Sequence, residues 1–442
     1  MAESIKKFKI FIEEKVKHLS SHYGFQRYLK NTGWMFVGQA ISMATSFVII
    51  IFLARYLGPA QYGLLNYVMS FCIIFAFLAG FGIDSVLNRE LVKNPQKHNE
   101  YLGTGFIIKL FGSFLCIVVI AASAYILHLD HFSKILVFIY SLSFIFQSLY
   151  VISAFFQSRV EAKYNRIAET IYNIISLVIK LLLIFFGFGI FWLVLAYAAD
   201  TAILSLCYLL VYKKNKFKVR DWKFDYRLAT ALLKDSWPLM FSSLAVTIYM
   251  KIDQVMIKSL LNDSAVGIYA AAAKISEVWY FIPAIICGSV FPAMVNAHKT
   301  TSAQFASRLK KLYSLLFWLS FLVALLVTCL SGFIINILYG FAYASAAPIL
   351  NVHIWSGVGM FLGIAVTQYL IVENYNKIFF YSTVLGAILN VLLNLFLIPH
   401  LGIMGAAIAT LMSYWFLLLF MIFFKKTRGQ ITNIFKGIVF KY

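Results

Sequence analysis

Five lysines interrupt long apolar stretches of this chain, where an ammonium group could bind an anion. Lys109, Lys180, Lys251, Lys258 and Lys274 each stand among aliphatic and aromatic residues. An ionised side chain in hydrocarbon costs about 2.5–3.5 kcal/mol at mid-helix, so such residues usually face the interior of a helical bundle or a wet cavity. A lysine near the end of a stretch can instead extend to the membrane surface, and this alternative stays open for Lys109 and Lys258.

Five carboxylates share these apolar stretches: Asp84, Glu169, Asp200, Asp253 and Glu277. A carboxylate inside a membrane protein either pairs with a cation or takes part in moving a proton or a metal ion. We therefore treat all five as candidates for ion coupling or for structural salt bridges. Asp84, near the end of its stretch, could also reach the membrane surface.

The densest cluster of charge falls in two neighbouring apolar stretches. Lys251 and Asp253 are two residues apart, which places them about 200° from each other around a helix, so both cannot face one cavity. Lys274 and Glu277 are three residues apart and share a helix face. We expect Asp253 to bridge to a neighbouring helix while Lys251 and Lys274 face a path for an anionic substrate. A network of internal structural salt bridges is the alternative.

Other cations are further candidates for substrate binding. Lys180 could contact a substrate or pair with Asp200 or Glu169. Arg55 stands at the outer end of the first apolar stretch, where the alternative is an arginine anchored at the membrane interface. Arg89 follows the second stretch and joins Lys109 among the substrate-binding candidates.

The chain contains no HExxH, GxSxG or Walker motif. Its cysteines form no CxxC pair and are typical of small core residues. They are Cys72, Cys116, Cys207, Cys287 and Cys329. His128, Asp130 and His131 are close in sequence, but they are more typical of a solvated loop than of a metal site. We expect no catalytic residue, no metal site and no cofactor. The protein is therefore not expected to be an enzyme.

The composition indicates that membrane-spanning helices position these residues. The chain is 62% hydrophobic and 12% charged, whereas soluble proteins carry about 25% charged residues. Its apolar stretches are long enough to cross a bilayer as helices and lack the short alternating pattern of barrel strands. The expected fold is an all-α polytopic membrane protein with twelve transmembrane helices. The expected spans are 33–54, 64–88, 102–127, 135–158, 167–187, 190–212, 236–261, 268–297, 312–335, 346–372, 378–398 and 405–424.

The positions of Lys and Arg predict the orientation of these helices. Cationic residues gather in alternate gaps between the expected spans, while the other gaps hold only Arg55 and Lys134. Cytoplasmic loops collect Lys and Arg, so we expect both termini in the cytoplasm. The formal net charge of +21 comes largely from these loops, and a nucleic-acid partner is not expected.

The expected helices divide into two sets of six. A basic cytoplasmic linker, 213–234, separates residues 33–212 from residues 235–424. Segment 1–32 has apolar residues at helical spacing among lysines, which favours an amphipathic helix on an anionic membrane surface. The chain ends in a basic cytoplasmic tail, 425–442.

A weak repeat relates the two halves. One constant shift aligns Leu57 with Leu261 and Gly63 with Gly267. Halves of six helices each enter the membrane from the same side, so the repeats are parallel. Secondary transporters use this architecture, and their substrate path runs between the repeats. We therefore expect the substrate path to lie between the two six-helix halves.

Several segments resemble a known family. Residues 53–64, LARYLGPAQYGL, are similar to the first-hairpin signature of the polysaccharide and O-antigen repeat-unit flippases (Wzx type) of the MOP (MATE-like) superfamily. The resemblance covers about residues 30–425. Further similar segments are 82–85, 88–90, 249–254, 266–269, 277–283, Asn390, Asn394, 398–399 and 402–407.

The resemblance implies a flippase of the bacterial inner membrane. It would move an undecaprenyl-pyrophosphate-linked oligosaccharide from the cytoplasmic to the periplasmic leaflet by alternating access, through a cationic cavity between two six-helix bundles. Its partners would be this lipid-linked substrate, membrane lipids, and glycan-assembly proteins such as a polymerase. Coupling to a proton or sodium gradient would use Asp253, Glu277, Asp84 or Glu169.

Three other functions are considered. A MATE-type multidrug or cation exporter is disfavoured because its cargo is cationic, whereas lysines exceed carboxylates in the expected cluster. A membrane glycosyltransferase or polymerase is disfavoured by the short outer loops. A flippase for the peptidoglycan precursor would be favoured by two further helices after the twelfth.

Overall fold

The computed structural model describes residues 23–439 and, among them, the side chains of residues 42–439 except 292, 299, 302, 376 and 417. Every regular element in this range is a helix. Most of the expected amphipathic segment 1–32 lies outside the described residues. The described chain forms two compact units. The first unit contains residues 23–50, 78–122 and 138–240, and the second contains residues 51–77, 123–137 and 241–439.

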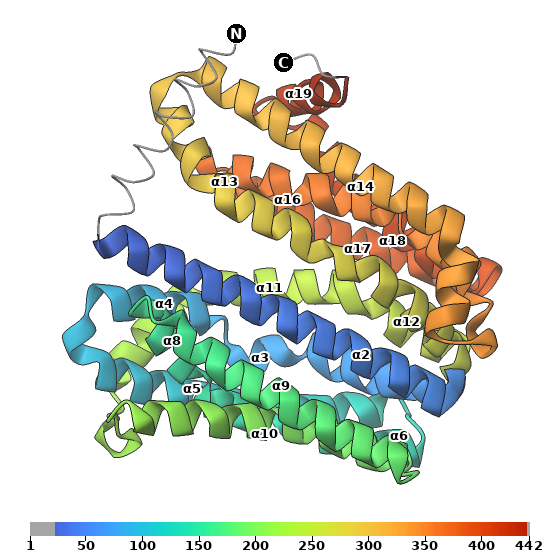
Figure 1. Cartoon of the computed structure of the whole chain (residues 1–442), viewed down its shortest axis with the longest axis horizontal. Helices are drawn as coiled ribbons and strands as arrows, with labels where there is room; N and C mark the ends of the chain where they lie inside the picture. The colour runs from blue at the N-terminus through green and yellow to red at the C-terminus, as the bar shows by residue number, and fades with distance from the viewer. Residues whose placement is uncertain (1–22, 440–442) are drawn as a thin grey trace, which may run out of the picture. The chain divides into compact units, whose positions relative to one another are not determined.

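The helices of the first unit pack around a core of aliphatic and aromatic side chains. Leu87, Leu102, Val151, Phe155 and Tyr212 are almost completely buried in this core. α9 and α10 run side by side as a hairpin (Figure 1). The helices that lie wholly or partly in this unit are α2 (Tyr23–Ile74), α3 (Ala76–Gly80), α4 (Ile83–Lys93), α5 (His98–Ile126), α6 (His131–Ser141), α7 (Ser143–Gln147), α8 (Val151–Ser158), α9 (Ala162–Phe185), α10 (Ile190–Lys214) and α11 (Tyr226–Leu260).

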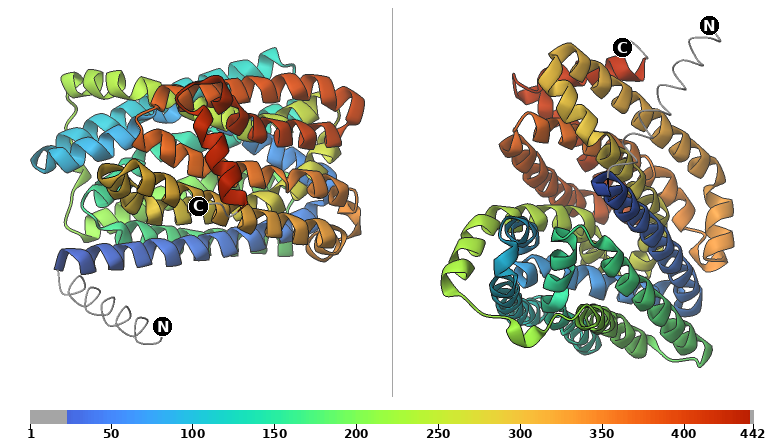
Figure 2. Two further views of the ribbon diagram at one scale, coloured as in Figure 1. Left: turned by 90° about the horizontal axis from the view of Figure 1, so that it is seen from above. Right: turned by 60° about the vertical axis from the view of Figure 1, so that its left-hand side comes forward.

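The second unit holds the remaining helices and parts of α2, α3, α5, α6 and α11. α14, α16 and α18 lie side by side (Figure 1), and the last helix, α19, packs against α14 (Figure 2). Leu309, Tyr313, Phe361 and Val366 lie in its core. The helices wholly in this unit are α12 (Asp263–Glu277), α13 (Phe281–Thr300), α14 (Ser302–Leu338), α15 (Ala346–His353), α16 (Ser356–Val372), α17 (Asn376–Leu401), α18 (Ile403–Leu419) and α19 (Arg428–Ile438).

The outward faces of these helices are strongly apolar. Phe111, Phe185, Leu326 and Phe396 are 67%, 82%, 60% and 67% exposed. Large apolar side chains at this density are unfavourable against water but suited to lipid chains. Among residues 23–439, ten helices are long and apolar enough to cross a membrane. The structure is therefore that of a polytopic α-helical membrane protein.

Two of the twelve expected spans are not among these ten. Span 64–88 is broken between α2, α3 and α4, where Phe81 and Gly82 have φ angles of 45° and 67°. Span 236–261 lies in α11, which is long but carries charged and polar side chains. A total of twelve membrane-spanning helices stays a prediction.

Packing divides the chain differently from the sequence. Segments 51–77 and 123–137 belong to the same compact unit as residues 241–439, whereas the expected division at the linker 213–234 assigns them to the N-terminal half. Contacts between helices, which the linker does not reveal, determine this grouping.

Two glycines related by the repeat pack directly against each other in the second unit. Gly58 has φ 66° and ψ 173°, which breaks α2 just before Pro59. The chain then brings Gly63 onto the start of α12. A Cβ atom on Gly63 would lie 1.7 Å from the carbonyl oxygen of Asp263, and one on Gly267 would lie 2.0 Å from that of Pro59. Only a glycine fits at either position.

Replacing Gly63 with alanine should lower the melting temperature of the purified protein by several degrees, because overpacking of a tight contact costs about 1–3 kcal/mol. Gly332→Ala in α14 is the matched control, since its Cβ would meet no atom within 4 Å. Alanine there should leave the melting temperature unchanged or raise it slightly. Thermal unfolding in detergent measures both variants. Equal melting temperatures would contradict the close packing of α2 on α12.

Candidate functional site

The charged cluster of α11 and α12 lies within the second unit. Lys251 Nζ is 3.5 Å from Glu277 Oε2, and the two side chains are 18% and 21% exposed. Lys274 is also half-buried, and it forms no hydrogen bond or ion pair with any residue that the structure describes. Glu277 lies within electrostatic range of Lys251, Lys274 and His353. Two ammonium groups thus face one carboxylate, and the cluster carries an excess of positive charge.

Asp253 lies in a separate and fully hydrogen-bonded environment. Its carboxylate accepts hydrogen bonds from the hydroxyl of Tyr269 at 2.7 Å, from Thr410 Oγ1 at 2.6 Å and from Asn394 Nδ2 at 2.5 Å. These partners belong to α12, α18 and α17, and Asp253 is 3% exposed. This agrees with the expectation that Asp253 bridges to neighbouring helices. Dipoles, rather than a cation, stabilise its charge.

A histidine completes this region. The ring of His353 packs edge-to-face on Tyr269 with centroids 5.7 Å apart. Its backbone carbonyl accepts hydrogen bonds from Ser276 and Ser356, and its Nδ1 atom is buried without a partner. His353 was not a sequence candidate, because a lone histidine in an apolar stretch carries no pattern that distinguishes it from a core residue.

The polar partners of Asp253 were also missed as site residues. Tyr269, Thr410 and Asn394 carry no charge, so nothing marks them singly. The available signal is the spacing of Asn390 and Asn394, which are four residues apart and therefore share one face of an apolar helix. Asn394 Nδ2 donates to Asn390 Oδ1 at 3.1 Å.

Lys180 forms an ion pair with Asp200 inside the first unit, one of the two alternatives that the sequence left open. Its ammonium group also donates to Ser176 Oγ at 2.7 Å and lies 3.8 Å from the ring centroid of Tyr197. The side chains of Lys180 and Asp200 are 3% and 9% exposed. These contacts favour a structural pair over a substrate ligand.

Three further candidates of the first unit have partners as well. Lys109 is buried and forms an ion pair with the exposed carboxylate of Asp84. Arg89 donates to Glu90 at 2.8 Å and pairs with Asp235, and both side chains of the latter pair are about half exposed. Glu169 accepts from Arg166 at 2.6 Å and from the hydroxyl of Tyr208 at 3.2 Å.

Arg55 caps a helix. Its Nε donates to the carbonyl oxygen of Leu338 at 2.8 Å, and a second nitrogen bonds the carbonyl of Ile337. These carbonyls end α14, where unpaired acceptors and the helix dipole favour a cation. Arg55 therefore stabilises the second unit.

Lys258 links three segments of the second unit. It lies 3.0 Å from Asp263, 3.8 Å from Asp130 and 2.8 Å from Ser133 Oγ. Partial burial raises the pKa of Asp130, but hydrogen bonds from Ser133 and the charge of Lys258 outweigh burial and lower the pKa overall. Asp130 is therefore ionised at neutral pH and can hold Lys258 in place.

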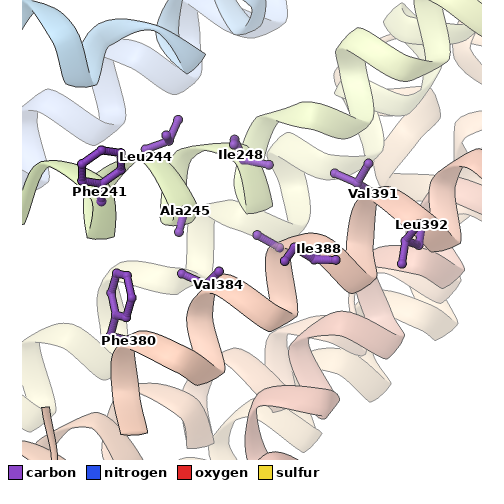
Figure 3. A pocket seen from close by; sticks show the side chains of 10 residues that line it. Phe241, Leu244, Ala245, Ile248, Phe380, Val384, Ile388, Val391 and Leu392 are labelled. Carbon is purple, nitrogen blue, oxygen red and sulfur yellow. The ribbon is translucent and has the colours of Figure 1, made fainter. Parts of the chain in front are cut away.

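An apolar groove runs along α11 towards the charged cluster. Its volume is about 400 Å³, and all ten lining side chains are hydrocarbon (Figure 3). Leu244 and Ile248 of α11 face Val384 and Ile388 of α17 across it. Ile248 precedes Lys251 by one helical turn, so the groove and the cluster follow each other along one helix.

Single substitution of the Lys180–Asp200 pair should destabilise the first unit. Lys180→Met or Asp200→Leu alone leaves one buried charge unpaired, at a cost of about 3–5 kcal/mol, whereas the double variant removes both charges. We expect the melting temperature to fall in each single variant and to recover in the double variant. Single variants as stable as the wild type would contradict a structural pair.

The sequence of this chain is similar to those of known proteins. A model of the family described as polysaccharide biosynthesis protein matches residues 28–298. The probable low-salt glycan biosynthesis flippase Agl15 of Haloferax volcanii is 24% identical over 387 residues, which cover 86% of this chain and 79% of that protein. A putative O-antigen transporter of Shigella flexneri is 24% identical over 402 residues, covering 86% and 93%.

Solved structures show the same fold. The lipid II flippase MurJ in an inward closed conformation superposes with a TM-score of 0.70 at 16% identity, covering 91% of this chain and 89% of that one. An inward-facing multidrug resistance MATE family transporter of the MOP superfamily has a TM-score of 0.69 at 14% identity, covering 89% and 96%. The fold is thus that of MOP superfamily transporters. The family model matches more than half of this chain, and the chain therefore belongs to the polysaccharide biosynthesis protein family.

Proposed function

We propose that the protein is a flippase that moves an undecaprenyl-pyrophosphate-linked oligosaccharide from the cytoplasmic to the periplasmic leaflet of a bacterial inner membrane, with both termini in the cytoplasm. Relatives named as a flippase and an O-antigen transporter support this reading. The observation that carries it is the excess positive charge at Lys251, Lys274 and Glu277. An ammonium group without a carboxylate partner inside a bundle favours an anionic ligand.

A pyrophosphate headgroup presents the complementary charge. It cannot enter hydrocarbon without replacing its hydration, and charge-assisted hydrogen bonds from lysine ammonium groups are suited to that replacement. Lys274 has no competing partner among the described residues, so the headgroup would meet it first. Lys251 would then exchange part of its interaction with Glu277 for the phosphate.

The apolar groove on α11 suits the other end of such a lipid. A polyisoprenoid chain is hydrocarbon throughout, as are the side chains that line the groove (Figure 3). Because Ile248 lies one turn from Lys251, a lipid whose headgroup contacts the cluster can lay its first isoprene units in the groove.

The membrane potential would favour export. An inside-negative potential moves an anion outward with about 2.3 kcal/mol per charge per 100 mV. The lysines stay in the protein, so their charges do not cancel the charge that is translocated. The proposed transport is by alternating access, as in other carriers built from parallel repeats.

A MATE-type exporter of organic cations shares the fold but fits the site less well. A cationic cargo would meet a cluster with more ammonium than carboxylate groups and would be repelled. The one deeply buried carboxylate nearby, Asp253, is enclosed by hydrogen-bond donors from three helices.

Ion coupling is proposed to use Asp253. Of the four candidates, Glu277, Asp84 and Glu169 each pair with a cation, whereas Asp253 is held only by hydroxyl and amide groups. A sodium ion takes oxygen ligands, and this site offers the Asp253 carboxylate and the hydroxyl oxygens of Tyr269 and Thr410. Asn394 Oδ1 is also buried nearby without a partner. A proton could instead bind the carboxylate itself.

Lys274→Met should reduce export of surface glycan by about tenfold or more, the value of a lost charge-assisted hydrogen bond. The same variant should be at least as stable as the wild type, because it removes a half-buried charge that has no partner. Lys274→Arg should be milder than Lys274→Met but not silent, since its hydration and shape differ. Surface glycan and membrane abundance measure these effects in a strain that lacks the chromosomal gene.

Lys251→Ala should also reduce export, with some loss of stability because Glu277 loses its nearest cation. Lys377→Ala is the control, since that lysine is exposed. Normal export by Lys251→Ala, Lys274→Met and their combination would contradict the cationic substrate path.

Asp253→Asn should uncouple transport from the ion gradient, because an amide has the same shape but cannot hold a proton or balance the charge of a sodium ion. In proteoliposomes, an inward proton or sodium gradient should accelerate lipid flipping by the wild type and not by Asp253→Asn. Glu169→Gln is the control and should keep the response. A variant that responds like the wild type would exclude Asp253 as the carrier.

A further inference from the structure

A polar pocket of about 300 Å³ lies within the first unit, and one of its lining residues, Asp84, pairs with Lys109. This volume is at the lower end of ligand pockets, which hold about 300–1,000 Å³. It is formed by α4, α8, α10 and the 3₁₀ turn η2 (Ser148–Tyr150). Seven of its eight lining residues are polar: Asp84, Ser85, Asn88, Tyr150, Ser153, Gln157 and Tyr208.

The pocket offers hydrogen-bonding groups that lack partners. Asn88 Oδ1 is buried without a hydrogen bond. Among the described residues, the side chains of Ser85, Tyr150 and Gln157 form no hydrogen bond either. Ser85 and Gln157 are exposed, whereas the buried Asn88 oxygen is unfavourable unless water or a ligand meets it. Together they provide both donors and acceptors.

The charges at the pocket cancel. Asp84 is paired with Lys109, and Glu169, which bonds the Tyr208 hydroxyl, is paired with Arg166. The pocket therefore differs from the cluster of Lys251 and Lys274, which has a positive excess. It suits a neutral ligand with many hydroxyl groups better than an anion or a cation.

Two tyrosines give the pocket an aromatic wall. The rings of Tyr150 and Tyr208 meet edge-to-face, with centroids 5.7 Å apart and an interplanar angle of 82°. An aromatic face contacts the C–H face of a sugar ring, while the surrounding polar groups bond its hydroxyls. On α4 the pocket residues run from Asp84 to Asn88, which directly precedes Arg89, at the end of the helix where cationic residues indicate the cytoplasmic side.

We propose that this pocket binds a neutral sugar residue of the transported glycan, an inference that rests on the proposed function for its source. The lysine cluster would hold the headgroup, which all such lipids share, and the polar pocket would distinguish glycosylated lipids from the bare carrier. Selectivity and charge recognition would thus belong to different sets of residues.

Binding to the purified full chain in nanodiscs tests this inference with three probes. They are undecaprenyl pyrophosphate, the lipid-linked oligosaccharides extracted from a strain without this gene, and the free oligosaccharide released from that extract by mild acid. The double variant Asn88→Ala/Gln157→Ala removes an amide on each side of the pocket. Ser205→Ala in α10 is the control, since its hydroxyl bonds the backbone carbonyl of Phe146 at 2.6 Å.

The wild type and Ser205→Ala should bind the glycosylated lipid about tenfold more tightly than the bare lipid, as expected for a few sugar hydrogen bonds. The double variant should lose this preference and keep the affinity for undecaprenyl pyrophosphate. Lys274→Met should lower the binding affinity for both lipids by the same factor.

Equal affinity of the wild type for the two lipids, or a double variant that keeps the preference, would overturn the sugar pocket and leave the headgroup site intact. If the wild type binds neither lipid, the proposed function fails and the free oligosaccharide decides. If the wild type then binds the free oligosaccharide and the double variant does not, the result supports a pocket for free sugars. If the wild type does not bind the free oligosaccharide, the inference is overturned.

Discussion

An ionised side chain in hydrocarbon needs a partner, and the described structure meets this constraint in nearly every case. Lys180 pairs with Asp200, and Lys109 pairs with Asp84. Hydroxyl and amide groups from three helices surround Asp253. The two ion pairs join helices that are close in sequence, with partners 25 residues apart or fewer, whereas Asn394 and Thr410 lie 141 and 157 residues from Asp253. Neutralised charges therefore connect both neighbouring and distant helices.

Lys274 departs from this pattern. It is half-buried beside a lysine and a single carboxylate, and no described residue pairs with it. An unpaired charge of this kind lowers stability unless a ligand of opposite charge binds to it. Functional sites are where proteins accept such a cost in stability. The apolar groove lies beside the charged cluster on α11, so a charged surface and a hydrocarbon surface follow each other within the second unit.

The class of fold was predictable because it depends on the length and composition of the apolar stretches, and the opposed faces of Lys251 and Asp253 follow from the helix period alone. The partners of Asp253 were not predictable. Asn394 and Thr410 lie 141 and 157 residues away, and only the packing of α11 against α17 and α18 brings them together. The polar pocket was equally unpredictable, since its residues come from three separate segments of the chain.

Some candidates turned out to have local structural tasks that no sequence pattern separates from ligand binding. Arg55 caps α14 through backbone carbonyls, which any residue type can supply. The contact of Gly63 with α12 shows the opposite case: the repeat identified both glycines, but only the backbone geometry explains why a larger residue cannot replace them.

The central claim is that Lys274 provides positive charge for a lipid headgroup. The most direct measurement is an experimental structure of the protein with undecaprenyl pyrophosphate bound. The account predicts a phosphate oxygen within about 4 Å of Lys274 Nζ, the range of an ion pair. A headgroup bound elsewhere, with Lys274 paired to Glu277 alone, would contradict it.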